Sequence, residues 1–60
     1  LSRHTSMAVG ILMARDKIGE RDAFDRLRAQ ARAQRRKIGD LANELVQGAE
    51  GAAVHAPKSL

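Results

Sequence analysis

Apolar residues recur at helical spacing along most of this 60-residue chain, and no stretch alternates with the period of two that is typical of a strand. The clearest helical segment runs from about Lys37 to Val46. Its apolar positions follow the spacing i, i+3, i+4, i+7, i+8 of one helix face, at Ile38, Leu41, Ala42, Leu45 and Val46. Gly48 follows as the expected C-terminal stop.

A second helix is predicted from about Glu20 to Gln34, with Gly19 as a backbone cap ahead of an acidic first turn. Its apolar stripe consists of Ala23, Phe24, Leu27 and Ala31. Two opposite-charge pairs at i,i+4 spacing, each contributing a few tenths of a kcal/mol, are expected on its surface: Arg21 with Asp25 and Asp22 with Arg26.

The first helix is predicted from an N-cap at Thr5 or Ser6 to Asp16. We expect its core face to hold Met7, Ala8, Ile11 and Leu12, with Ile18 closing the core from the turn that follows. Val9 and Met13 are then surplus apolar residues. They predict an exposed apolar seam for a second copy of the chain or for a partner domain.

Together the three segments predict an all-α fold, a small three-helix bundle. We expect the folded domain to span residues 1–48 and residues 49–60, with their Gly/Ala clusters and the one proline, to form a flexible C-terminal tail. Because the first residue is Leu1 and a chain this short buries little core, we expect the domain to be part of a longer chain.

The charge is unevenly distributed. Eleven basic residues face seven acidic ones, a net charge of +4, and eight of the basic residues are arginine. The segment RLRAQARAQRRK, residues 26–37, holds six of them, and Arg21, Arg28, Arg32 and Arg35 share one side of the second helix. Such a ridge favours a polyanionic partner, and a merely solvated helix face is the alternative. Phe24, the one aromatic residue, is assigned to the core, so no stacking platform for bases is expected.

Other classes of function find little support in the sequence. There is no cysteine, His4 and His55 lie near opposite ends, and no serine or threonine has a base placed beside it, so we expect no enzyme, no metal site and no cofactor. The isolated glycines do not form a phosphate-binding loop. No apolar run approaches the roughly 20 residues of a membrane span, and there is no signal peptide pattern, which predicts a cytoplasmic protein.

Residues 7–46 resemble the ANTAR domain, the RNA-binding module of bacterial transcription antitermination regulators. The resemblance runs without gaps. It rests on the AVGILM segment of the first helix, on the AF and LR pairs of the second, and on the small apolar repeat of the third: Ala8, Gly10, Ile11, Leu12, Met13, Ala23, Phe24, Leu27, Arg28, Ala31, Ala42 and Val46. The chain departs from the family pattern at Val9, often lysine, at Gly19, often a serine or threonine cap, and at Arg35, often asparagine.

The resemblance implies a three-helix domain that binds paired hairpins in leader RNA and prevents a terminator from forming. It also implies a homodimer and an N-terminal sensor domain of GAF or receiver type. We expect small residues to allow close approach of the RNA backbone and basic residues to contact phosphates and base edges. The predicted RNA-binding residues are Ala8, Gly10, Arg15, Arg28, Arg32, Arg35, Arg36 and Lys37.

Two other functions stay open. A protein interaction or dimerisation module that has lost RNA binding would use Val9 and Met13. A DNA-binding helical domain is less favoured, because the turn between the second and third helices lacks a recognition-helix pattern.

Overall fold

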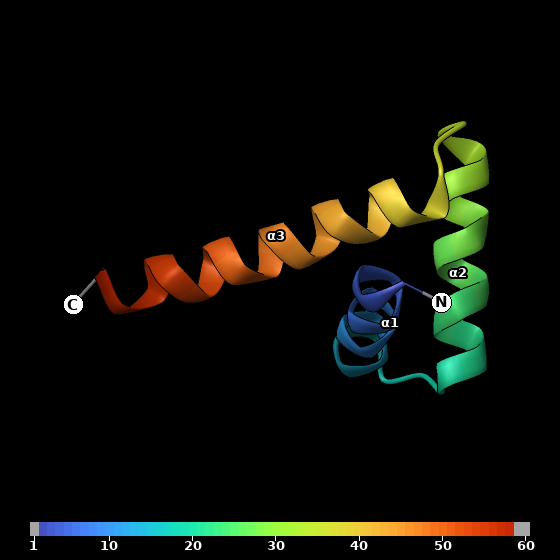
Figure 1. Ribbon diagram of the computed structural model, residues 1–60. Coiled ribbons are helices and arrows are strands. Elements are labelled where there is room, and N and C mark those ends of the chain that lie inside the picture. The colour runs from blue at the N-terminus through green and yellow to red at the C-terminus, as the bar shows by residue number, and fades with distance from the viewer. Residues whose placement is uncertain (1, 59–60) are drawn as a thin grey trace.

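A computed structural model of the chain describes residues 2–58, which form three helices connected by short turns (Figure 1). They are α1 (Arg3–Asp16), α2 (Glu20–Ala33) and α3 (Ile38–Lys58). α1 packs against both other helices, and α3 crosses α2 and then runs past α1, so that the molecule measures 38 × 23 × 20 Å. The prediction of a small all-α three-helix bundle is confirmed.

α1 begins earlier than predicted. Ser2 is the N-cap, with extended backbone angles, and its Oγ accepts a 3.1 Å hydrogen bond from the Thr5 backbone N–H. The hydroxyl of Thr5 lies 2.8 Å from the same Oγ, which satisfies a side chain that is only 3% exposed. The predicted cap at Thr5 or Ser6 is therefore wrong, because Thr5 is a buried residue of the first turn.

The core face of α1 is also rotated from the predicted one. Thr5, Ala8, Val9 and Leu12 are buried and Met13 packs against the core, whereas Met7 is 43% exposed and Ile11 is half-buried. Val9 was expected on the surface, and that expectation is wrong because it is only 5% exposed. A second apolar side of α1 faces away from the core. It consists of Met7, Gly10, Ile11 and Ala14, and we call it the outer strip of α1.

α2 and α3 present the faces that their spacing predicted. The buried core residues on α2 are Ala23, Leu27 and Ala31, and those on α3 are Leu41, Ala42 and Val46. Partly buried apolar side chains close the core around them: Ile18, Phe24, Ile38 and Leu45. Small alanines at 0–3% exposure on all three helices let the helix axes approach closely, so this short chain forms one continuous core.

Both turns contain a basic residue in the left-handed conformation. Lys17, after α1, has φ 55°, and Arg35, after α2, has φ 54°. At the second turn the Arg36 N–H donates to the Ala31 carbonyl at 2.9 Å and the Arg35 N–H donates to the Arg32 carbonyl at 3.1 Å. These two bonds are a Schellman motif with Arg35 at the position that usually holds glycine.

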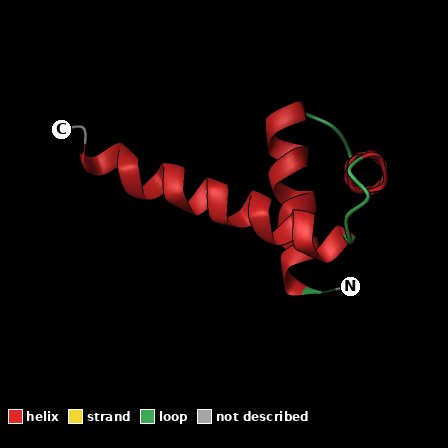
Figure 2. Cartoon of the chain, turned by 90° about the horizontal axis from the view of Figure 1, so that it is seen from above, coloured by secondary structure: helices red, strands yellow, loops and turns green. Residues whose placement is uncertain are grey.

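α3 is longer than predicted. It was expected to stop at Gly48, but Gly48 has no left-handed φ and the helix continues to Lys58. In Figures 1 and 2 the C-terminal part of α3 extends beyond the other two helices. The assignment of residues 1–48 to the domain and of residues 49–60 to a flexible tail stays a prediction, and the end of that tail, residues 59–60, lies outside the described residues.

The two ion pairs predicted within α2 do not form among the described residues. Arg26 instead reaches back to α1, where its Nη1 lies 3.2 Å from Asp16 Oδ2. Asp16 also accepts a 3.2 Å hydrogen bond from Arg15 Nε. Hydrogen bonding by Arg15, with a further contribution from Arg26, holds the pKa of Asp16 below its ordinary value of 3.8.

Candidate nucleic-acid interface

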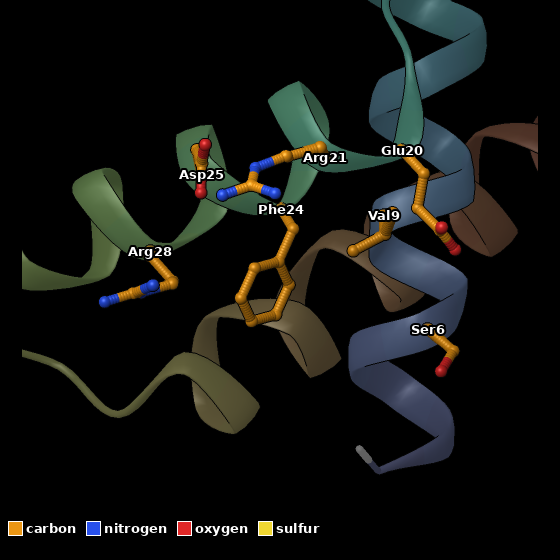
Figure 3. A pocket seen from close by; sticks show the side chains of 7 residues that line it. All are labelled: Ser6, Val9, Glu20, Arg21, Phe24, Asp25 and Arg28. Carbon is orange, nitrogen blue, oxygen red and sulfur yellow. The ribbon is translucent and has the colours of Figure 1, made fainter.

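Two grooves lie on either side of Phe24. The first, of about 630 Å³, separates α1 from the N-terminal half of α2 (Figure 3). Val9 and Phe24 supply its apolar side chains. The polar side chains around them are those of Ser6, Glu20, Arg21, Asp25 and Arg28. We call this the α1–α2 groove.

The second groove, of about 300 Å³, lies between α2 and the start of α3, and we call it the α2–α3 groove. Three arginines from the predicted ridge line it together with apolar side chains: Phe24, Arg28, Ala31, Arg32, Arg36 and Ile38. No carboxylate lines this groove. The structure thus brings Arg28, Arg32 and Arg36 together around one depression, as a phosphate-binding surface requires.

Phe24 and Arg28 border both grooves. The guanidinium carbon of Arg28 lies over the Phe24 ring, 5.9 Å from its centroid, within the range of a cation–π contact. Phe24 packs against the core, as predicted, but it is only partly buried, and part of its side chain lines the grooves. The Phe24 side chain lines the α1–α2 groove, and Figure 3 shows the Val9 side chain pointing toward it from α1.

Arg36 is held in place by an ion pair. Its Nη2 donates a 2.8 Å hydrogen bond to Glu44 Oε2 on α3, and its Nη1 donates to Gln34 Oε1 at 3.3 Å. This hydrogen bond from Arg36 lowers the pKa of Glu44 from its ordinary value and raises that of Arg36. Part of the charge of Arg36 is therefore balanced within the protein.

The other predicted basic residues lie apart from the grooves. Arg15 pairs with Asp16 at the end of α1 and lines neither groove. Arg35 and Lys37 are exposed in the α2–α3 turn, next to Arg36 along the chain. They extend the positive surface beyond the α2–α3 groove without lining it.

The two small residues predicted to contact RNA differ in their surroundings. Ala8 is fully buried, so its predicted role in RNA contact is wrong, and its small size serves helix packing instead. Gly10 is exposed, and a Cβ added there would meet no atom within 4 Å, so helix packing does not explain this glycine. Of the predicted seam, Val9 is buried and Met13 packs against the core.

Sequence reasoning missed four residues of the α1–α2 groove as site residues: Ser6, Glu20, Phe24 and Asp25. Arg21 was placed on the ridge but not in the predicted site. The spacing of Arg21, Phe24, Asp25 and Arg28 is i, i+3, i+4, i+7, one face of a helix, and this signal could have grouped them.

Among residues 2–49, whose side chains the structure describes, there is no group of three or more histidine and acidic side chains placed to hold a metal ion. Across residues 2–58, none of the helices has the length and apolar character that a membrane span needs.

A model of a known protein family matches most of the chain. The family model described as ANTAR domain matches residues 2–46, which covers all of α1 and α2 and the docked part of α3. No curated protein and no solved structure matches the chain.

Proposed function

This chain belongs to the ANTAR family, the RNA-binding domains of transcription antitermination regulators, and from that premise we propose that it binds hairpins in leader RNA and prevents a terminator from forming. The protein would act by differential affinity. A ligand that binds one of two competing RNA folds more tightly shifts the equilibrium toward that fold. Such a role needs a surface for RNA and no catalytic group.

The observation that carries the proposal is the clustering of Arg28, Arg32 and Arg36 around the α2–α3 groove, which no carboxylate lines. Arginine binds phosphate oxygens through two parallel N–H donors and stays charged at any physiological pH. Arg35 and Lys37 in the neighbouring turn add positive charge beside the groove. Contacts of this kind position an RNA backbone.

The resemblance to the family also suggests a larger assembly. We propose that the domain acts in the bacterial cytoplasm, as a homodimer, under the control of an N-terminal sensor domain of GAF or receiver type. Such a sensor domain would decide when the arginine surface is available to RNA. The outer strip of α1 supports this assembly, because Met7 on it is 43% exposed and Ile11 beside it is only half-buried.

Salt-dependent binding to a synthetic RNA of two tandem stem-loops tests the RNA-binding function. We expect Arg28→Ala/Arg32→Ala to weaken binding at least tenfold and to reduce the salt slope by about 1 to 2, since each lost phosphate contact removes about 0.7 to 0.9. Arg26→Ala is the matched control. It removes one arginine from α2 about 200° around the helix from Arg28, and Arg26 lines neither groove. Equal affinity and slope for the double variant and wild type would contradict the proposal.

A protein interaction module is the second candidate, now through the outer strip of α1 in place of the Val9 and Met13 seam. A helix that is apolar on more than one side is usually covered on more than one side. Sedimentation velocity of Met7→Asp against wild type tests a homodimer built on this strip. A wild-type chain that sediments as a monomer at all concentrations, unchanged by the substitution, would exclude it.

A further inference from the structure

The α1–α2 groove differs in chemistry from the α2–α3 groove beside it. It combines an apolar wall of Val9 and Phe24 with both signs of charge, from Arg21 and Arg28 and from Glu20 and Asp25. Neither carboxylate is engaged in an ion pair within the part of the chain that the structure describes. A site built only for phosphate would repel its ligand from these carboxylates.

A nucleobase satisfies each part of this lining. Its flat apolar face can stack on the Phe24 ring, and the N–H groups on its edge can donate to carboxylate oxygens. The volume of about 630 Å³ lies within the range of small-ligand sites. Val9, on the α1 side of the groove, adds a second apolar side chain to the lining (Figure 3).

Because the two grooves share a border, a bound base and the RNA backbone that carries it can occupy neighbouring grooves. Arg28 lines both grooves and lies over the Phe24 ring, so a nucleotide whose base enters the α1–α2 groove leaves its phosphate near Arg28 and the α2–α3 groove. Arg32 and Arg36 there can hold the next phosphates along the strand.

We propose that the α1–α2 groove binds one unpaired nucleobase of a hairpin loop, stacked against Phe24 with its edge on Asp25 or Glu20. This inference rests on the RNA-binding function proposed above and adds a specificity-determining site to it. Phe24 discriminates looped-out bases from paired ones, while the arginines of the α2–α3 groove bind any backbone. An A-form helix hides its base faces, so a fully paired RNA cannot use the groove.

The test compares a stem-loop RNA with a fully paired duplex of the same number of phosphates, using Phe24→Leu. Leucine keeps an apolar side chain in the core and removes the aromatic face. We expect the variant to bind the stem-loop roughly 5- to 150-fold more weakly, the range given by loss of base–aromatic stacking. Binding to the duplex and the salt slope should not change, because no phosphate contact is lost. Phe24→Tyr, which keeps the ring, is the matched control.

Abasic substitutions at each loop position provide a second measurement. One position should reproduce the loss in the wild-type protein and cause no further loss with Phe24→Leu. Asp25→Asn in combination with Glu20→Gln should change which base is preferred at that position, even if Phe24→Leu does not fold. Equal stem-loop affinity for a folded Phe24→Leu, or no sensitive loop position, overturns the proposed groove. A wild-type protein that binds neither RNA overturns the RNA-binding function itself.

Discussion

Arg36 Nη2 and Glu44 Oε2 lie 2.8 Å apart and join the α2–α3 turn to α3. The contact holds one of the three arginines of the α2–α3 groove in a defined position. It also links the position of this arginine to α3, because losing either partner removes this side-chain contact between the turn and the helix.

The Arg36–Glu44 pair should make stability depend on acid. The pKa of Glu44 is lowered by Arg36 in the folded state, so the pair stabilises the protein above the ordinary value of 4.5, and this contribution is lost as the pH falls through the lower, folded-state pKa. The pKa of Asp16 is also lowered in the folded state, so its ionised carboxylate stabilises the protein as well. That contribution is lost as the pH falls below 3.8. We expect the Tm of Glu44→Gln to fall less steeply on acidification than that of wild type.

Arg36→Gln is the matched variant, since it breaks the same contact from the other side. The two single variants and the double variant should show the same acid dependence, as measured by thermal unfolding between pH 3 and pH 7. Additive losses in the double variant would show that the two side chains act independently.

The left-handed turn residues should limit stability. A residue with a Cβ in this conformation lowers the stability of the folded state by roughly 1–2 kcal/mol, and glycine does not carry this cost. Lys17→Gly and Arg35→Gly should each raise the free energy of unfolding by about 1 kcal/mol, as measured by urea denaturation. Lys37→Gly, at a residue without a positive φ, is the control and should give no gain. The asparagine frequent at position 35 in the family fits the same requirement, because asparagine tolerates this conformation.

Gly10→Ala should separate stability from RNA binding. Alanine at this exposed position meets no atom within 4 Å and should stabilise α1 by about 0.5–1 kcal/mol. If the RNA backbone approaches α1 at Gly10, the more stable variant will bind the tandem stem-loop RNA more weakly. Unchanged binding would remove Gly10 from the proposed RNA-binding residues.

Val9→Lys should add charge to the α1–α2 groove. Because Val9 lies at 5% exposure on the groove wall, a lysine there would run its aliphatic stem along the α1 side of the groove and bring its ammonium to the mouth. We expect tighter binding to the stem-loop RNA and a salt slope larger by about 0.7 to 0.9. Val9→Met, which adds length without charge, controls for packing, and an equal gain with methionine would contradict an effect of charge.

Sequence patterns predicted the buried faces of α2 and α3 well because polar residues separate their apolar positions. On α2, for example, Ala23 and Leu27 lie among charged residues, which leaves one choice of face. In α1 nearly every position from Met7 to Ala14 is apolar, so periodicity could not decide between the face with Met7 and Ile11 and the observed face with Thr5 and Val9. Burial of the Thr5 hydroxyl depends on its partner Ser2, a contact that spacing alone does not specify.

The sequence predicted one of the two grooves of the candidate site and missed the other. The charge run located Arg28, Arg32 and Arg36, since all lie within one short segment. The α1–α2 groove was missed because Val9 comes from another helix and because Phe24 was assigned wholly to the core. How far an aromatic side chain remains open to solvent depends on the angle at which helices cross, which the sequence pattern does not give.

The length of α3 has a consequence for local unfolding of the helix. Among residues up to Ala49, whose burial is described, Val46 is the last to contribute to the core, and Figures 1 and 2 show the helix continuing without another helix beside it. Helical turns without tertiary packing exchange their amide protons through local fraying, whereas packed turns exchange only when the whole domain unfolds. We therefore expect α3 to unfold as two cooperative units, one on each side of Val46. Protection of its amides should be high as far as Val46 and should fall toward Lys58.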